Sequence, residues 1–148
     1  MDVSGRTTKV ELDTRNWSAP SRRSLAAEFA GAHYQDLPLR CRRCDSGFVF
    51  TAAQQRQAFE VRKAYIWQQR TLCAECWQQR LALTGELRQL KSRWRAQRAT
   101  LKRDIAALRR WRELLRQLPF YGCRQDLAQI AMLERLLDAD DRREVVLG

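Results

Sequence analysis

Two Cys-x-x-Cys pairs constrain this chain more than any other feature. They are Cys41-Arg-Arg-Cys44 and Cys73-Ala-Glu-Cys76, and 28 residues separate them. Each pair can form a tight turn that directs two thiolates at one ion, and two such turns complete a tetrahedral shell. A shell of four sulfur atoms leaves no open position for water or substrate, which favours structural over catalytic zinc. The pattern therefore predicts one structural Zn2+ ion with the ligands Cys41, Cys44, Cys73 and Cys76.

Other chemistries also use cysteines in this pattern. A thioredoxin-like redox motif needs a flanking βαβ pattern, which is absent here. An iron–sulfur cluster also takes four cysteines and stays open as the rival to zinc. Cys123 stands alone beside a turn signal, and we interpret it as a small buried residue rather than a ligand or nucleophile.

Length and hydropathy place limits on the class of protein. The chain has 148 residues, 45% of them hydrophobic, which suits one folded domain or a small domain with an appendage. No run of 18 apolar residues is present, so we expect no membrane span. The first residues lack the apolar core of a secretory signal. We therefore expect a cytoplasmic protein, whose five cysteines serve as metal ligands or free thiols.

Positive charge is the second strong feature. Lys and Arg number 28 against 17 Asp and Glu, a formal charge of +11, and a four-thiolate zinc site would lower it to about +9. Residues 37–118 hold 19 basic and six acidic residues. Such a surface favours RNA or DNA as partner, although a solvated helix face balanced by the acidic C-terminal segment is the alternative. The candidate nucleic-acid contacts are Arg42, Arg43, Arg95 and Arg98.

Composition divides the chain into three parts. Residues 1–36 are polar with balanced charge, and we predict a mostly flexible N-terminal arm with a short helix near Leu25. An aromatic residue in such an arm, Trp17, would suit docking on a partner. Residues 37–80 contain the four paired cysteines and form the zinc module. Residues 81–148 are predicted to be helical.

The helical part is predicted to fold back on itself. Residues 81–118 lack Pro and repeat apolar residues in heptads, which predicts one long basic helix whose stripe only Gln97 and Asp104 interrupt. Pro119 and Gly122 end this helix, and residues 124–138 resume helical spacing. We expect an antiparallel hairpin with Trp94 and Trp111 as packing anchors. In it, three residues of the last helix, Leu127, Ile130 and Leu137, face Leu108, Trp111 and Leu115.

The residues between the cysteine pairs predict a strand and then a helix. Phe48-Val49-Phe50 has strand propensity, and Thr51 with Gln54 reads as a capping box that opens a helix at Ala52. Core packing is the preferred interpretation of Phe48, Phe50 and Phe59, and an exposed base-stacking surface is the lesser one.

The segment Leu39-Arg-Cys41-Arg-Arg-Cys44-Asp-Ser-Gly-Phe48-Val-Phe-Thr, followed by Cys73-Ala-Glu-Cys76, resembles a known family. It is similar to the probable zinc-ribbon domain family of bacterial proteins over about residues 34–80. The resemblance implies metal at the four cysteines and says little of function. Asp45 stands where the family usually has Gly, and Ala74 where it has Pro. Because Asp tolerates a left-handed backbone, the first turn should persist.

The expected fold is a small α+β zinc ribbon followed by an α-helical hairpin or coiled coil, mainly α overall. The expected function is non-enzymatic nucleic-acid binding. A protein-interaction adaptor is the alternative, with the stripe at Leu87, Leu90 and Trp94 meeting a second copy or a partner helix. Enzyme activity and a small-molecule substrate are not expected, because His33 is the only histidine and no nucleophile elbow or Gly-rich phosphate loop exists.

Overall fold

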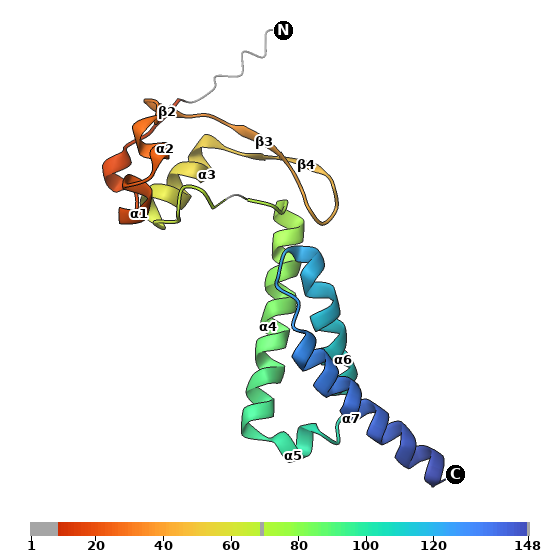
Figure 1. Ribbon diagram of the computed structural model, residues 1–148. Helices are drawn as coiled ribbons and strands as arrows, with labels where there is room; N and C mark the ends of the chain where they lie inside the picture. Colours follow the sequence, from red (N-terminus) through yellow and green to blue (C-terminus); the bar gives the residue numbers. More distant parts are fainter. Residues whose placement is uncertain (1–8, 69, 148) are drawn as a thin grey trace. The chain divides into compact units, whose positions relative to one another are not determined.

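The computed structural model describes residues 9–68 and 70–147, which form two compact units. The first unit comprises the chain up to Cys41 and Asp45–Cys73, and the second comprises Arg42–Cys44 and the chain from Ala74 onward. The strands lie in the first unit and the long helices in the second (Figure 1). Within the described part of the chain, no helix is both long and apolar enough to cross a membrane.

Two antiparallel strand pairs organise the first unit. β1 (Val10–Glu11) pairs with β2 (His33–Tyr34), and β3 (Leu37–Arg40) pairs with β4 (Gly47–Phe50). The β3–β4 register leaves residues 41–46 as the turn of a hairpin. The short helices of this unit are η1 (Thr14–Asn16), α1 (Ala19–Arg22), α2 (Leu25–Glu28), α3 (Ala52–Arg56) and the π-helix η2 (Gln57–Val61).

Residues 9–36 differ from the predicted flexible arm, while residues 1–8 lie outside the described residues. Trp17 is only 3% exposed, and its Nε1 donates a hydrogen bond to Tyr34 Oη at 2.8 Å. Both side chains belong to one buried cluster with Phe50 and Phe59. We predicted that Trp17 docks on a partner, but its side chain packs against residues of its own chain. The segment is ordered because its aromatic residues complete the core of the first unit.

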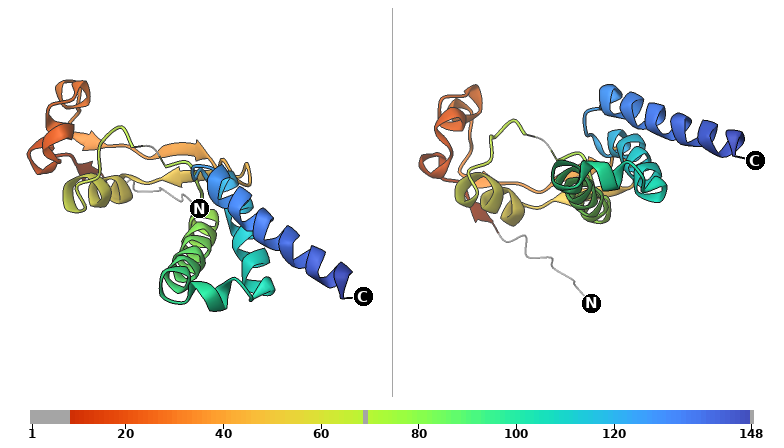
Figure 2. Two further views of the ribbon diagram at one scale, coloured as in Figure 1. Left: turned by 60° about the horizontal axis from the view of Figure 1, so that its bottom comes forward. Right: turned by 90° about the horizontal axis from the view of Figure 1, so that it is seen from below.

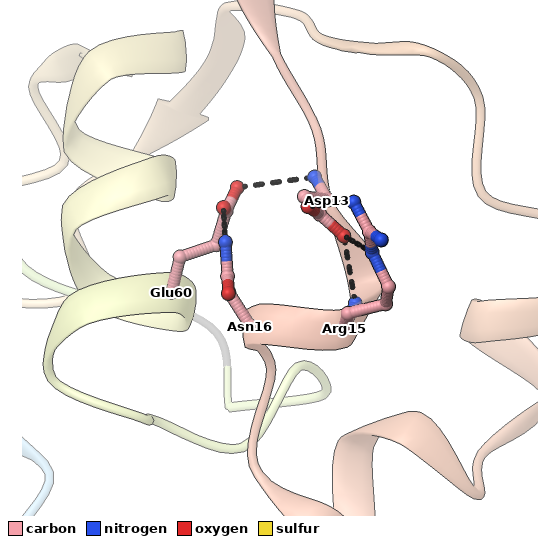
Figure 3. A network of polar contacts seen from close by, with 4 residues as sticks. All are labelled: Asp13, Arg15, Asn16 and Glu60. Atoms are coloured by element: carbon pink, nitrogen blue, oxygen red, sulfur yellow. Dashed lines mark hydrogen bonds and ion pairs between the residues drawn. The ribbon is translucent and has the colours of Figure 1, made fainter.

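A buried carboxylate also fixes this segment. Glu60 is 7% exposed, and its oxygens accept hydrogen bonds from Asp13 N at 3.3 Å and Asn16 Nδ2 at 3.1 Å. Figure 3 shows this network, in which the Asp13 carboxylate accepts hydrogen bonds from the backbone N–H and the guanidinium group of Arg15. Since a buried polar group needs hydrogen-bond partners, Glu60 ties η1 to η2 across more than 40 residues of sequence.

The predictions for the region after the first cysteine pair are confirmed, except for the packing of Phe48. Phe48 and Phe50 lie in β4, and the Thr51–Gln54 capping box opens α3 at Ala52. Phe50 and Phe59 are buried, with ring centroids 6.0 Å apart in an edge-to-face arrangement. The core packing predicted for Phe48 is not found, because its side chain is only partly buried and belongs to neither apolar cluster.

The single long helix predicted over residues 81–118 is wrong. α4 (Ala74–Ala96) ends before Gln97, α5 (Arg98–Leu101) follows, and α6 (Ile105–Gln117) begins after Asp104. Gln97 leaves the helical region with φ −140° and ψ 50°. The Asp104 carboxylate caps α6 by accepting a hydrogen bond from Ala107 N at 3.1 Å. The two residues that interrupt the apolar stripe therefore stand where the helix stops and restarts.

The predicted break at Pro119 and Gly122 is confirmed. η3 (Leu118–Tyr121) is a 3-10 turn, and Gly122 follows it in the left-handed region with φ 85°. Here the freedom of glycine is needed, because an L-residue is strained at that angle. α7 (Leu127–Val146) then runs beyond the predicted end at residue 138.

One apolar cluster holds α4, α6 and α7 together, and these helices lie side by side in Figures 1 and 2. α4 and α6 are antiparallel, as the ion pairs Arg93–Asp104 and Arg110–Glu86 require. The side chains of Leu108, Leu114 and Leu133 are fully buried. The Trp94 and Trp111 rings pack edge to face at 5.6 Å, as expected of packing anchors.

The hairpin packing is confirmed for Ile130 and Leu137, which are buried in this cluster. It is wrong for Leu127, which is 67% exposed because it is the first residue of α7, one turn before the packed face. The stripe at Leu87, Leu90 and Trp94 packs within the chain, because the break at Gln97 turns α6 back onto α4. Within this packing Leu90 is buried, while Leu87 and Trp94 are partly buried.

Candidate metal centre

The first cysteine pair lies in the turn between β3 and β4. Cys41 is 1% exposed, and its N–H donates to Ser46 O at 2.8 Å. Asp45 N donates to Cys41 O at 2.9 Å, so the turn is closed from both sides. Asp45 has φ 63°, the left-handed conformation that a short polar side chain tolerates. The expectation that Asp45 preserves the turn is thereby confirmed.

The second pair lies at the start of α4. Cys73 directly precedes the helix, and Cys76 is its third residue and 4% exposed. Residues three apart lie on one face of a helix, which directs both side chains to the same side. The positive end of the helix dipole favours the negative charge of thiolates at this place.

The four cysteine side chains converge. Their Sγ atoms all lie within 4.8 Å of one another. Tetrahedral zinc with Zn–S bonds of about 2.3 Å places its sulfur ligands about 3.8 Å apart, so the spacing fits that ion. Four thiolates are also the donor set of structural zinc sites. The predicted cofactor, one structural zinc ion, is confirmed, and it cross-links the hairpin turn to the first turn of α4.

The hairpin turn and the helix start define a small structural-zinc domain. Residues 35–83 match the model of the family described as a probable treble clef domain, and this segment is a treble clef zinc-binding domain. The match covers nearly the same residues as the resemblance to the zinc-ribbon family. In this segment the second ligand pair, Cys73 and Cys76, lies at the start of α4 rather than in a second tight turn. Comparison with curated proteins found no match, and comparison with solved structures found none.

The four arginines predicted to contact nucleic acid are all exposed, but they do not form one cluster. Arg42 and Arg43 lie in the hairpin turn between two zinc ligands. Arg95 lies in the last turn of α4, and Arg98 opens α5. Along α4, Arg95 lies 19 positions after Cys76, which corresponds to about 28 Å at 1.5 Å per residue.

A group of side chains beside the zinc ligands was missed by the sequence analysis. The Arg43 guanidinium lies 5.3 Å from the centre of the Tyr121 ring. Tyr121 Oη donates to Gln79 Oε1 at 2.9 Å, and Arg80 Nη1 donates to the Tyr121 carbonyl oxygen at 3.3 Å. Arg80 also covers the Trp77 ring, at 5.2 Å. The sequence did offer one signal for this group, the position of Trp77 directly after the ligand Cys76. The contact between this region and η3 could not be predicted, because about 40 residues separate the two segments.

Proposed function

We propose that this chain is a non-enzymatic structural-zinc protein of the reducing cytoplasm that binds RNA or DNA through a basic surface on its helices. One observation carries the proposal: Arg95 and Arg98 are exposed, and neither forms an ion pair within residues 9–68 and 70–147. Their charge is thus available to phosphates. Three other arginines of this unit are ion-paired, in Arg93–Asp104, Arg110–Glu86 and Arg116–Glu134.

The cations around Trp94 are held in place before any ligand arrives. Arg98 lies 5.1 Å and Lys102 lies 5.9 Å from the centre of the Trp94 ring. Cation–π contacts of this kind restrain long side chains while leaving their charge at the surface. Arginine also offers a planar, bidentate group that suits phosphate oxygens.

The chemistry of the site supports a non-catalytic role. Four cysteine ligands close the coordination shell, so substrate has no position on the metal. His33, the only histidine, is an exposed residue of the two-residue strand β2. In the proposal, zinc therefore stabilises the domain and the helices provide the binding surface.

A salt series tests the proposal. Binding of a labelled oligonucleotide should weaken steeply with salt, with a log–log slope of roughly −0.7 to −0.9 per phosphate contacted. The double variant Arg95→Ala, Arg98→Ala should weaken binding and make the slope less negative by about one to two units if each contacts a phosphate. Adding Arg42→Ala and Arg43→Ala should make the slope less negative still. The measurement is fluorescence anisotropy at several salt concentrations.

The matched control is Arg110→Ala with Arg116→Ala, which removes the same formal charge from two ion-paired arginines. It should change the slope less than the Arg95 and Arg98 pair does. Equal slopes for the two double variants, or no binding near physiological salt, would contradict the proposed surface.

A protein-interaction adaptor is the second candidate, and the end of α7 favours it. Val145, Val146 and Leu147 are 80%, 81% and 88% exposed. If a protein complex survives nuclease and moderate salt but is lost when Val145 and Val146 become Ser, the adaptor function replaces nucleic-acid binding.

A further inference from the structure

The second unit exposes two aromatic rings near its zinc ligands. Trp77, in the first turn of α4, is 44% exposed, and Phe120, in η3, is 67% exposed. Neither belongs to an apolar cluster of the described residues. We propose that these two rings, the exposed rings, stack on unpaired bases of a single-stranded nucleic acid. This inference rests on the proposed function and adds the form of nucleic acid that is bound.

The segments that hold the exposed rings are joined by specific contacts. Arg80 covers the Trp77 ring at 5.2 Å and donates to the Tyr121 carbonyl oxygen at 3.3 Å. Tyr121, the neighbour of Phe120, is only 7% exposed and bonds Gln79 through its hydroxyl. The backbone that presents both rings is thus fixed, so little conformational entropy is lost when a ligand binds.

The first zinc-ligand turn contributes to the same support. Arg43 lies over the Tyr121 ring, and a Cβ at Gly122 would meet Arg42 Nη1 at 3.6 Å. The guanidinium groups of this turn are therefore close to η3, within the second unit. Zinc binding and the presentation of Phe120 are connected through these contacts.

The local charge suits a nucleic acid. Segments 42–44, 74–80 and 118–124 contain four arginines and one carboxylate, Glu75. The balance stays positive after the charge of −2 of a four-thiolate zinc site is included. Exposed aromatic rings among guanidinium groups are the combination that binds single strands, in which bases stack on the rings and phosphates meet the cations.

The geometry of bases explains the preference for single strands. In a duplex, base faces are stacked on one another and only their edges are accessible in the grooves. A protruding indole or phenyl ring can stack only on a base whose face is free. Stacking needs no particular base, so little sequence preference is expected.

The test uses the zinc-loaded full chain and labelled oligonucleotides near physiological salt. The probes are single-stranded RNA, single-stranded DNA and a duplex of equal length. Trp77→Ala and Phe120→Ala should each weaken single-strand binding by roughly 5- to 100-fold, while Trp77→Phe retains most of it. The matched control is Leu81→Ala, since Leu81 lies one turn after Trp77 in α4 and is 46% exposed. It should change affinity less than about twofold, within the usual range for a surface substitution.

Circular dichroism and zinc content establish that each variant is folded, and Phe120→Ala replaces Trp77→Ala if the latter is not. Stacking is supported when single strands bind tighter than the duplex and both aromatic variants lose affinity. If both variants bind like the wild type, or if the duplex binds tighter, stacking is overturned while nucleic-acid binding stands. If no probe binds the wild type near physiological salt, the proposed function fails as well.

Discussion

At the scale of single residues, Trp17 joins the N-terminal segment to the core of the first unit. Its indole N–H is buried and has Tyr34 Oη as its acceptor at 2.8 Å. Tyr34 in turn packs against Phe59, with ring centroids 6.4 Å apart. A buried donor that loses its acceptor is costly, so the Tyr34 hydroxyl contributes to the stability of this unit.

Replacing Tyr34 with Phe tests this dependence. The free energy of unfolding at neutral pH should fall by about 1–3 kcal/mol, because Trp17 Nε1 then has no acceptor. Burial raises the pKa of Tyr34 above its usual value. Above pH ~10 the unfolded chain therefore releases a proton that the folded chain retains, and wild-type stability falls. Tyr34→Phe has no phenolic proton to release. The difference in the free energy of unfolding between the wild type and this variant should therefore shrink as pH rises through this range.

Urea unfolding at pH 8 and at about pH 10.5 measures both effects. Tyr65→Phe is the matched control, because this variant loses the same hydroxyl group from a side chain that is 45% exposed. A constant difference between wild type and Tyr34→Phe over this pH range would show that Tyr34 ionisation does not contribute.

At the scale of elements, Asp104 determines where α6 begins. It accepts the Ala107 N–H at 3.1 Å and forms an exposed ion pair with Arg93 at 3.3 Å. These contacts, the backbone hydrogen bond first, lower the pKa of Asp104. Its stabilising effect is therefore present above pH ~4 and is lost as pH falls through the lowered value.

Asp104→Ala should reduce the free energy of unfolding by about 0.5–2 kcal/mol, the usual range for a lost N-cap. Asp104→Asn should retain most of the stability, because Asn caps helices well and exposed ion pairs contribute little. Thermal unfolding of both variants measures the difference, with Asp138→Ala, an exposed site within α7, as control. If Asn is as damaging as Ala, the ion pair rather than the cap is responsible.

Features that depend on neighbours in sequence could be predicted here. The two ligand pairs and the capping box at Thr51 follow from spacing over a few residues. The left-handed Asp45 follows from its position where the family that the segment resembles usually has Gly. The start of α6 after Asp104 could also have been predicted, since an Asp before an apolar run is typical of a helix N-cap. The heptad spacing favoured one continuous helix instead. The order of residues 9–36 was not, because Trp17 and Asn16 find their partners far along the chain.

At the scale of the whole molecule, zinc and the helical core stabilise different residues. The cluster around Leu108, Leu114 and Leu133 contains none of the zinc ligands. The hairpin turn, by contrast, owes its position to the metal and to the contact of Arg43 with Tyr121. Loss of zinc should therefore unfold the domain around residues 37–80 and leave the core between α6 and α7 intact.

Cys44→Ser should lower zinc content from about one ion per chain to a small fraction, because three ligands remain. Hydrogen exchange should then become fast around residues 37–50 and at the start of α4, since metal binding supplies folding free energy there. Exchange in α6 and in α7 near Leu133 should stay slow, because those amides are protected by the apolar cluster. Cys123→Ser, which removes the fifth cysteine, should keep both zinc and protection. Equal loss of protection in α6 would show instead that the chain unfolds as one cooperative unit, and iron with sulfide in the purified protein would refute the zinc site.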